Sequence, residues 1–356
     1  MGYQGKNVLV TGGLGFIGSN LSIRLVRQGA RVTVVDSSVA GCGANPYNLH
    51  EIIDRARVIP LGICDAEQFR SDLERSDIIF NLAGEISHTH SMEFPERDLQ
   101  INSVAQLQFL LACRKYAPGR RVVYASTRQI YGVPDYLPLD ETHPINPVDF
   151  NGIHKYAASM YHMLLSRTGD IDAVVLRLTN VYGPRMALNI PCQGFLSTFL
   201  RRLLLGQPIA IFGDGTQLRD PMYVDDAVEA FLAAGSVEKV PNRVYNVGGP
   251  EALPISAIAE MASEAAGGAG IAYQPFPEYR KAIDIGSYYT DSTRIRDDLG
   301  WEPRVGFRCG IQQTIDYYRG RLEHYLDPSG AEPTCNMPEH NGMLRRLTFA
   351  AVEPCR

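Results

Sequence analysis

Thr11-Gly12-Gly13-Leu14-Gly15-Phe16-Ile17-Gly18 follows directly on the apolar run Val8-Leu9-Val10 and leads into the amphipathic segment Asn20–Gln28. The pattern predicts a strand, a tight turn and a helix. In such a unit the first glycine allows the turn, the second lets the backbone approach a pyrophosphate, and the third lets the helix pack closely on the strand. The free N–H groups at the start of the helix then face the phosphates. The stretch therefore indicates a dinucleotide-binding turn.

A carboxylate, Asp36, closes the second predicted strand 24 residues after Gly12. At this position a carboxylate accepts hydrogen bonds from the ribose 2′- and 3′-hydroxyls of NAD and repels the 2′-phosphate of NADP. Ser37 and Ser38 follow it, so no arginine stands there to hold that phosphate. NAD is therefore the expected cofactor.

Short β-branched runs alternate with helical segments through the first two-thirds of the chain. This alternation predicts an α/β fold with a doubly wound parallel (Rossmann) sheet and helices on both faces. The predicted strands are Val8–Thr11, Arg31–Val35, Val58–Leu61, Ile78–Leu82, Val122–Ser126 and Ala173–Leu178, and the predicted helices include Asn20–Gln28, Ser103–Lys115 and Lys155–Arg167.

The pattern changes after Gly183-Pro184, where shorter segments are separated by glycine and proline. A smaller C-terminal α/β lobe that binds the substrate is expected there. The predicted division is an NAD-binding Rossmann domain at 1–185, with some later segments returning to it, and a substrate-binding lobe at 186–326. Residues 327–356 lack clear periodicity and form an extension with no assigned role.

Composition excludes several classes of function. The net charge of −5 disfavours a general nucleic-acid binder, because phosphate neutralisation needs a basic face. The seven cysteines show no metal-like spacing, so no metal is expected. No apolar run approaches the roughly 18–20 residues that span a bilayer. These features predict a cytoplasmic protein that acts on a small molecule.

The motifs together resemble those of the extended short-chain dehydrogenase/reductases of the nucleotide-sugar epimerase/dehydratase family. The resemblance covers about residues 5–320. Besides the glycine-rich turn, its motifs are Asn81-Leu82-Ala83-Gly84, Asn102, Ser126-Thr127-Arg128-Gln129-Ile130-Tyr131-Gly132, Arg177–Arg185, Phe212-Gly213-Asp214-Gly215, Arg219-Asp220, Tyr223-Val224-Asp225-Asp226, Tyr245–Gly249 and Leu299–Pro303. The resemblance implies NAD, a nucleotide-diphosphate sugar as partner, and a homodimer formed through two helices of the cofactor domain.

The resemblance also assigns binding residues. Those implied for NAD are Gly12, Gly15, Phe16, Ile17, Gly18, Asp36, Ile63, Leu82, Ala83, Gly84, Asn102 and Lys155. Those implied for the sugar nucleotide are Glu85, His90, Asn180, Arg219 and Arg280. One contact departs from the family: Gly62 stands where many relatives carry an aspartate that reaches the adenine amino group.

The catalytic positions also depart from the family. Thr127 and Lys155 match its Ser/Thr and Lys, but Asn151 stands where the family has a tyrosine. An amide cannot act as a general base at neutral pH. Candidates for the missing base are Tyr131, His88, His90, Glu85 and His154, of which His154 is expected to point away from the helix face that carries Asn151 and Lys155.

A further departure narrows the reaction. Family dehydratases commonly carry two acidic residues directly after the threonine, and decarboxylases often keep a glutamate at the second position, where this chain has Arg128 and Gln129. The sequence therefore favours an epimerase, most like a 4-epimerase that oxidises the sugar transiently and retains NAD. Two alternatives stay open. One is another nucleotide-sugar conversion with a non-tyrosine base, such as epimerisation at a different carbon or an unusual dehydration or decarboxylation. The other is a binding protein without turnover.

Overall fold

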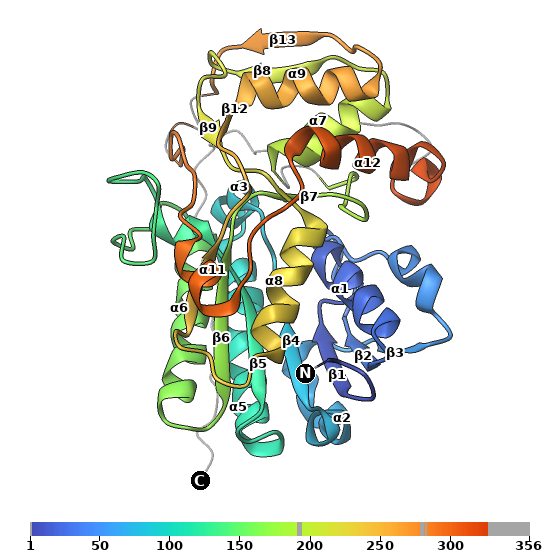
Figure 1. Ribbon diagram of the computed structural model, residues 1–356, viewed down its shortest axis with the longest axis vertical. Helices are drawn as coiled ribbons and strands as arrows, with labels where there is room; N and C mark the ends of the chain where they lie inside the picture. Colours follow the sequence, from blue (N-terminus) through green and yellow to red (C-terminus); the bar gives the residue numbers. More distant parts are fainter. Residues whose placement is uncertain (1, 191–193, 278–280, 282, 327–356) are drawn as a thin grey trace, which may run out of the picture.

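Seven parallel strands form the central sheet, in the order β11-β6-β5-β4-β1-β2-β3 (Figure 1). The computed structural model describes residues 2–190, 194–277, 281 and 283–326. The strands of the sheet are β1 (Asn7–Thr11), β2 (Arg31–Val35), β3 (Ala56–Ile59), β4 (Ile78–Asn81), β5 (Arg121–Thr127), β6 (Asp172–Leu178) and β11 (Val244–Val247). The predicted doubly wound sheet is confirmed.

Alternate residues of each strand enter different cores on the two faces of the sheet. In β1, Val8 and Val10 pack into one core and Leu9 packs into the other. The first core is covered by α1 (Phe16–Arg27), α8 (Val224–Ser236) and α11 (Thr293–Leu299), and the second by α2 (Arg70–Arg75), α5 (Ala105–Tyr116) and α6 (Phe150–Arg167). Burial on both faces explains why these strands are almost continuously apolar.

Two elements differ from the sequence prediction, one in where it begins and one in that it was not predicted at all. Helix α6 begins at Phe150, five residues before the predicted start, because the Asp149 carboxylate accepts a hydrogen bond from the Gly152 N–H at 2.7 Å and caps the helix. Strand β11 was not predicted as a strand, since it is short and contains an asparagine, yet it pairs with β6 at the edge of the sheet.

A smaller lobe lies beside the carboxyl ends of the strands, at the top of Figure 1. Its apolar core joins helices α7 (Phe195–Leu204), α9 (Ile255–Ala266) and α12 (Phe307–Arg319) to the strand pair β8 (Ile209–Phe212) and β13 (Ile271–Gln274). The remaining short elements are β7 (Val181–Tyr182), β9 (Leu218–Arg219), β10 (Met222–Tyr223), β12 (Leu253–Pro254), α3 (His88–Glu93), α4 (Pro95–Leu99), η1 (Pro46–Ile52), η2 (Ile63–Phe69), η3 (Gln100–Val104), η4 (Arg128–Tyr131) and η5 (Leu322–His324). Within the described ranges no helix is both long and apolar enough to cross a membrane.

Candidate active site

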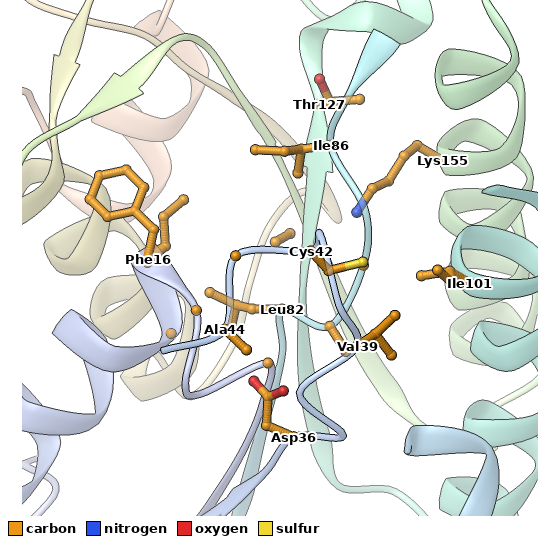
Figure 2. Close-up of a pocket in the computed structure, with 18 of the residues that line it drawn as sticks. Phe16, Asp36, Val39, Cys42, Ala44, Leu82, Ile86, Ile101, Thr127 and Lys155 are labelled. Carbon is orange, nitrogen blue, oxygen red and sulfur yellow. The ribbon is translucent and has the colours of Figure 1, made fainter. Parts of the chain in front are cut away.

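A cleft of about 500 Å³ lies at the carboxyl ends of β1, β2, β4, β5 and β6, where open α/β sheets bind their ligands. Figure 2 shows Asp36 at one end of this cleft, Thr127 at the other, and the Lys155 ammonium turned toward the space between them. The cleft therefore connects the predicted cofactor residues with the predicted reacting residues in one continuous space.

The glycine-rich turn forms the floor of the cleft and leaves no room for side chains. Gly12 has a φ of +66°, and a Cβ there would lie 2.8 Å from the backbone nitrogen of Ala83. A Cβ on Gly18 would clash with the Gly12 carbonyl oxygen. Helix α1 then begins at Phe16 with no capping side chain and no acidic residue in its first turn. Its first N–H groups are thus free to bind phosphate.

Asp36 is held in place by the backbone around it. Its two carboxylate oxygens accept hydrogen bonds from the Leu14 N–H at 3.0 Å and the Ser38 N–H at 2.9 Å. Burial raises the pKa of Asp36, and these two amides oppose that rise. Each oxygen keeps a lone pair for a ribose hydroxyl. Together with the glycine cradle, this carboxylate fits NAD.

The other residues assigned to NAD divide into two groups. Gly15, Ile17, Ile63, Leu82, Ala83, Gly84 and Lys155 line the cleft with those already named. Asn102 is fully buried behind the wall instead, where its amide group binds the backbone of Glu85 at 3.0 and 3.1 Å. A side chain on Gly84 would clash with both Asn102 and Lys155. Asn102 therefore stabilises the backbone of the cleft wall at Glu85 and does not itself line the cleft.

Lys155 is a buried ammonium that lines the cleft with no hydrogen-bond partner in the described part of the chain. It lies over the Tyr124 ring, whose centroid is 5.5 Å from Nζ. Burial lowers the pKa of Lys155 to about 8, although the Asp98 carboxylate acts in the opposite direction. The unpaired donors of this ammonium are available to a ligand.

Asn151, at the position of the missing tyrosine, faces a buried carboxylate. Its Nδ2 donates to the Glu85 carbonyl oxygen at 2.9 Å and to Asp98 Oδ2 at 2.8 Å. Since both partners are acceptors, they fix the orientation of the amide and leave Oδ1, a buried atom without a partner in the described residues, for the cleft. His154 Nδ1 binds the same Asp98 at 2.7 Å. His154 thus approaches the same carboxylate as Asn151, but unlike Asn151 and Lys155 it does not line the cleft.

His88 and Asp149 form a hydrogen-bonded pair at the reacting end of the cleft. His88 Nδ1 lies 2.6 Å from Asp149 Oδ2, and 34% of the His88 side chain is exposed against 2% for Asp149. Burial tends to raise the pKa of Asp149, but the hydrogen bond and charge of His88 and the Gly152 amide outweigh it, so the net shift is downward. An ionised Asp149 places the proton of a neutral His88 on Nδ1 and leaves Nε2 as an acceptor. The Gln129 amide contacts the same Nδ1.

The other candidates for the base are engaged elsewhere and do not line the cleft. Tyr131 is fully buried, donates to Asn246 Oδ1 at 2.7 Å, and accepts from Arg177. Burial raises the pKa of Tyr131. Glu85 is buried and pairs with His90 at 2.5 Å. Of the residues weighed as the base, His88 is the one that lines the cleft.

The residues assigned to the sugar nucleotide are placed unequally. Asn180 lines the cleft, and its buried Oδ1 has no hydrogen-bond partner within the described ranges. Arg219 is buried and donates to the carbonyl oxygens of Leu218 at 2.7 Å and Gly286 at 2.6 Å, outside the cleft lining. Arg280 lies outside the described residues. Arg128, not assigned to binding from the sequence, lines the cleft as well.

Comparison with known proteins identifies the relatives of this chain. Residues 8–248 match the model of the NAD dependent epimerase/dehydratase family. The chain is 33% identical over 318 residues to a UDP-glucose 4-epimerase of Mycolicibacterium smegmatis, covering 88% of this chain and 99% of that protein. It is 30% identical over 336 residues to UDP-glucuronic acid decarboxylase 1 of Xenopus tropicalis, covering 90% of this chain and 73% of that protein.

The fold is similar to that of a solved relative. The structure of UDP-glucose 4-epimerase from Thermotoga maritima with UDP-glucose is 33% identical to this chain. Its TM-score is 0.80, with 89% of this chain and 99% of that chain covered. The resemblance drawn from the motifs is thus confirmed, and the chain belongs to the NAD-dependent epimerase/dehydratase family of extended short-chain dehydrogenase/reductases.

Proposed function

We propose that this protein is an epimerase of nucleotide-linked sugars, most like a 4-epimerase, that works by transient oxidation with NAD retained. The observation that carries the proposal is the continuous cleft, which joins Asp36 to the group formed by Thr127, Lys155 and His88. Similarity to UDP-glucose 4-epimerases supports it. Arg128 and Gln129 at the positions of the family's acidic residues argue against dehydration and decarboxylation, because neither can exchange a proton with the sugar at neutral pH.

His88 is the proposed proton carrier. The Thr127 hydroxyl would hold the sugar hydroxyl, and Nε2 of His88 would take its proton. The Asp149 carboxylate then stabilises the imidazolium and keeps the ring in the required tautomer. NAD, which the glycine-rich turn and Asp36 would hold, would supply reversible hydride acceptance at the same sugar carbon. Because the sugar carbon would regain its hydride and His88 would give its proton back to the sugar oxygen, the reaction has no net oxidation.

Lys155 and Asn151 are proposed to hold the ligands rather than the proton. The unpaired Lys155 ammonium would donate to cofactor hydroxyls. The Asn151 Oδ1, fixed by Asp98 and the Glu85 carbonyl, would accept a hydrogen bond from a ligand donor. These roles explain why an asparagine is usable at a position where the family has a base.

The function is tested by incubating the purified protein with UDP-glucose, UDP-galactose, their N-acetylated forms and UDP-glucuronic acid. Products would be followed by NMR and bound NADH by its absorbance. The expected result is interconversion of a C4 epimer pair with no accumulation of NADH. Elimination or loss of CO₂ would instead indicate another conversion. Binding without conversion of any sugar would favour loss of turnover, the possibility that Asn151 raises.

The role of the His88–Asp149 pair is tested by two substitutions and a control. His88→Gln should lower kcat by about 10²- to 10⁴-fold. Asp149→Asn should also lower kcat while keeping an oxygen that can cap α6 through the Gly152 N–H. His50→Gln, at an exposed residue outside the cleft, is the matched control. NAD affinity should be unchanged in all three, and a kcat unchanged in His88→Gln would refute the assignment.

A homodimer through the two helices α5 and α6 is also proposed. Both helices carry exposed apolar side chains: Leu107 and Leu111 on α5, and Ile153, Met160 and Leu164 on α6. These side chains are 38–47% exposed on one chain. Two such faces packed together would remove this apolar area from water.

A further inference from the structure

Arg128 is a buried cation that lines the cleft and has no hydrogen-bond partner for its side chain among the described residues. The residue is 7% exposed, and its Nη1 makes no hydrogen bond with the part of the chain that the structure describes. Within the described residues the guanidinium forms no ion pair either, and its close neighbour is the ring of Tyr288, whose centroid lies 4.7 Å from Cζ. A buried donor without a partner needs an explanation, because leaving it unsatisfied is costly.

The charges around Arg128 do not satisfy it. Asp149, Asp220 and Asp284 act on it through space, and Arg219 repels it. Asp149 already holds His88, Asp220 accepts from Thr179 and Thr290, and Asp284 accepts from Gln217. Each of these carboxylates is thus occupied by another donor. Arg219 donates instead to the backbone carbonyl oxygens of Leu218 and Gly286.

The guanidinium lies over the ring of Tyr288, in a cation–π contact that helps to fix its position. A guanidinium fixed in this way presents a planar fork of N–H groups that matches the two oxygens of a carboxylate or phosphate. Arg128 follows Thr127, which is proposed to hold the reacting hydroxyl, and precedes Gln129, which contacts His88. Arg128 therefore lines the same cleft as the residues assigned to the sugar.

We propose that Arg128 binds an oxyanion group of the substrate, supplied either by the carboxylate of a uronic acid sugar or by the diphosphate. This inference rests on the proposed function, since it assumes that the cleft takes a nucleotide sugar. It adds a residue that determines which sugar nucleotides are accepted. It also explains how an arginine is tolerated at a position where other members of the family carry an acid.

The proposal is tested by calorimetric titration of the NAD-loaded protein with UDP-glucuronic acid, UDP-glucose and UDP. Three proteins are compared: the unchanged chain, Arg128→Met and Arg128→Lys. Arg308→Met, at an exposed arginine on α12, is the matched control. Removal of the guanidinium should weaken binding of the relevant ligand about 10- to 100-fold. Arg128→Lys should recover only part of the lost binding affinity, because a lysine lacks the planar fork.

The pattern across ligands identifies the group that is bound. Weaker binding of UDP-glucuronic acid alone supports the sugar carboxylate, and equal weakening of all three ligands supports the diphosphate. Unchanged affinity for all three in Arg128→Met would overturn the proposal. Unchanged NAD affinity and thermal midpoint would show that the variant is folded. Because binding is read directly, the test remains decisive even if the protein proves not to turn over any sugar.

Discussion

Replacing Lys155 by methionine is expected to stabilise the NAD-free protein and to abolish its activity. Methionine fills nearly the same volume without a charge. Burial lowers the pKa of the Lys155 ammonium from 10.5 to about 8. At about 1.4 kcal/mol for each pKa unit, the charged form costs the folded state about 3 kcal/mol.

The pH dependence has a definite sign. The folded pKa lies below the unfolded one, so the cost of burying the charge is present in full below about pH 8. Between about 8 and 10.5 the unfolded chain binds more protons than the folded one, and the stability of the unchanged protein rises with pH. Lys155→Met lacks this rise. The two proteins should therefore differ by about 3 kcal/mol at pH 7 and by less than half of that at pH 9.5.

The assay is urea unfolding of both proteins, stripped of NAD, at several values between pH 6.5 and 10. Other titrating groups are shared, so the difference between the two free energies of unfolding isolates Lys155. A Lys155→Met protein that is less stable at pH 7, or a difference that does not change with pH, would refute the reasoning. Either result would mean that the folded protein stabilises the ammonium as well as water does.

Three further predictions concern the cofactor turn and the helix pair. Gly18→Ala should lower the free energy of unfolding by about 1–3 kcal/mol in urea and weaken NAD binding in calorimetry, because its Cβ would press on the Gly12 carbonyl oxygen. An unchanged NAD affinity would contradict the role given to this turn. Asp36→Asn should lower the affinity for NAD about 10- to 100-fold through loss of charge-assisted hydrogen bonds. Equal affinity for NAD and NADP in the unchanged protein would count against the role given to Asp36. Leu111→Glu combined with Leu164→Glu should give a monomer in light scattering, and a persistent dimer would place the interface elsewhere.

The sequence predicted those features that arise from neighbours along the chain. The turn from Gly12 to Gly18 and the carboxylate Asp36 were found because strand, turn and helix follow one another with fixed spacing. The alternation of strands and helices was sufficient for the sheet. Strand β11 was missed because its four residues, with an asparagine among them, carry too weak a pattern for burial at a sheet edge.

The sequence could not predict contacts that join distant segments. His88 and Asp149 are 61 positions apart, and Asn151 and Asp98 are 53 apart. Neither carboxylate stood out, although Asp149 occupies a cap position two residues before Asn151, which was a usable local signal. Only the fold shows that the Asn151 amide donates to two acceptors, the Glu85 carbonyl oxygen and Asp98, and is held by them in a defined orientation.

The central claim is that a hydride leaves the sugar and returns to the same carbon. Its most direct test uses a nucleotide sugar with deuterium at C4, incubated with the protein in ordinary water and followed by NMR and mass spectrometry. The account predicts that the epimer keeps the deuterium at C4. In the converse experiment, with unlabelled sugar in D₂O, the epimer should gain no deuterium at C4. Loss of the label to water would contradict the account, because it would show epimerisation by removal and return of a proton at carbon.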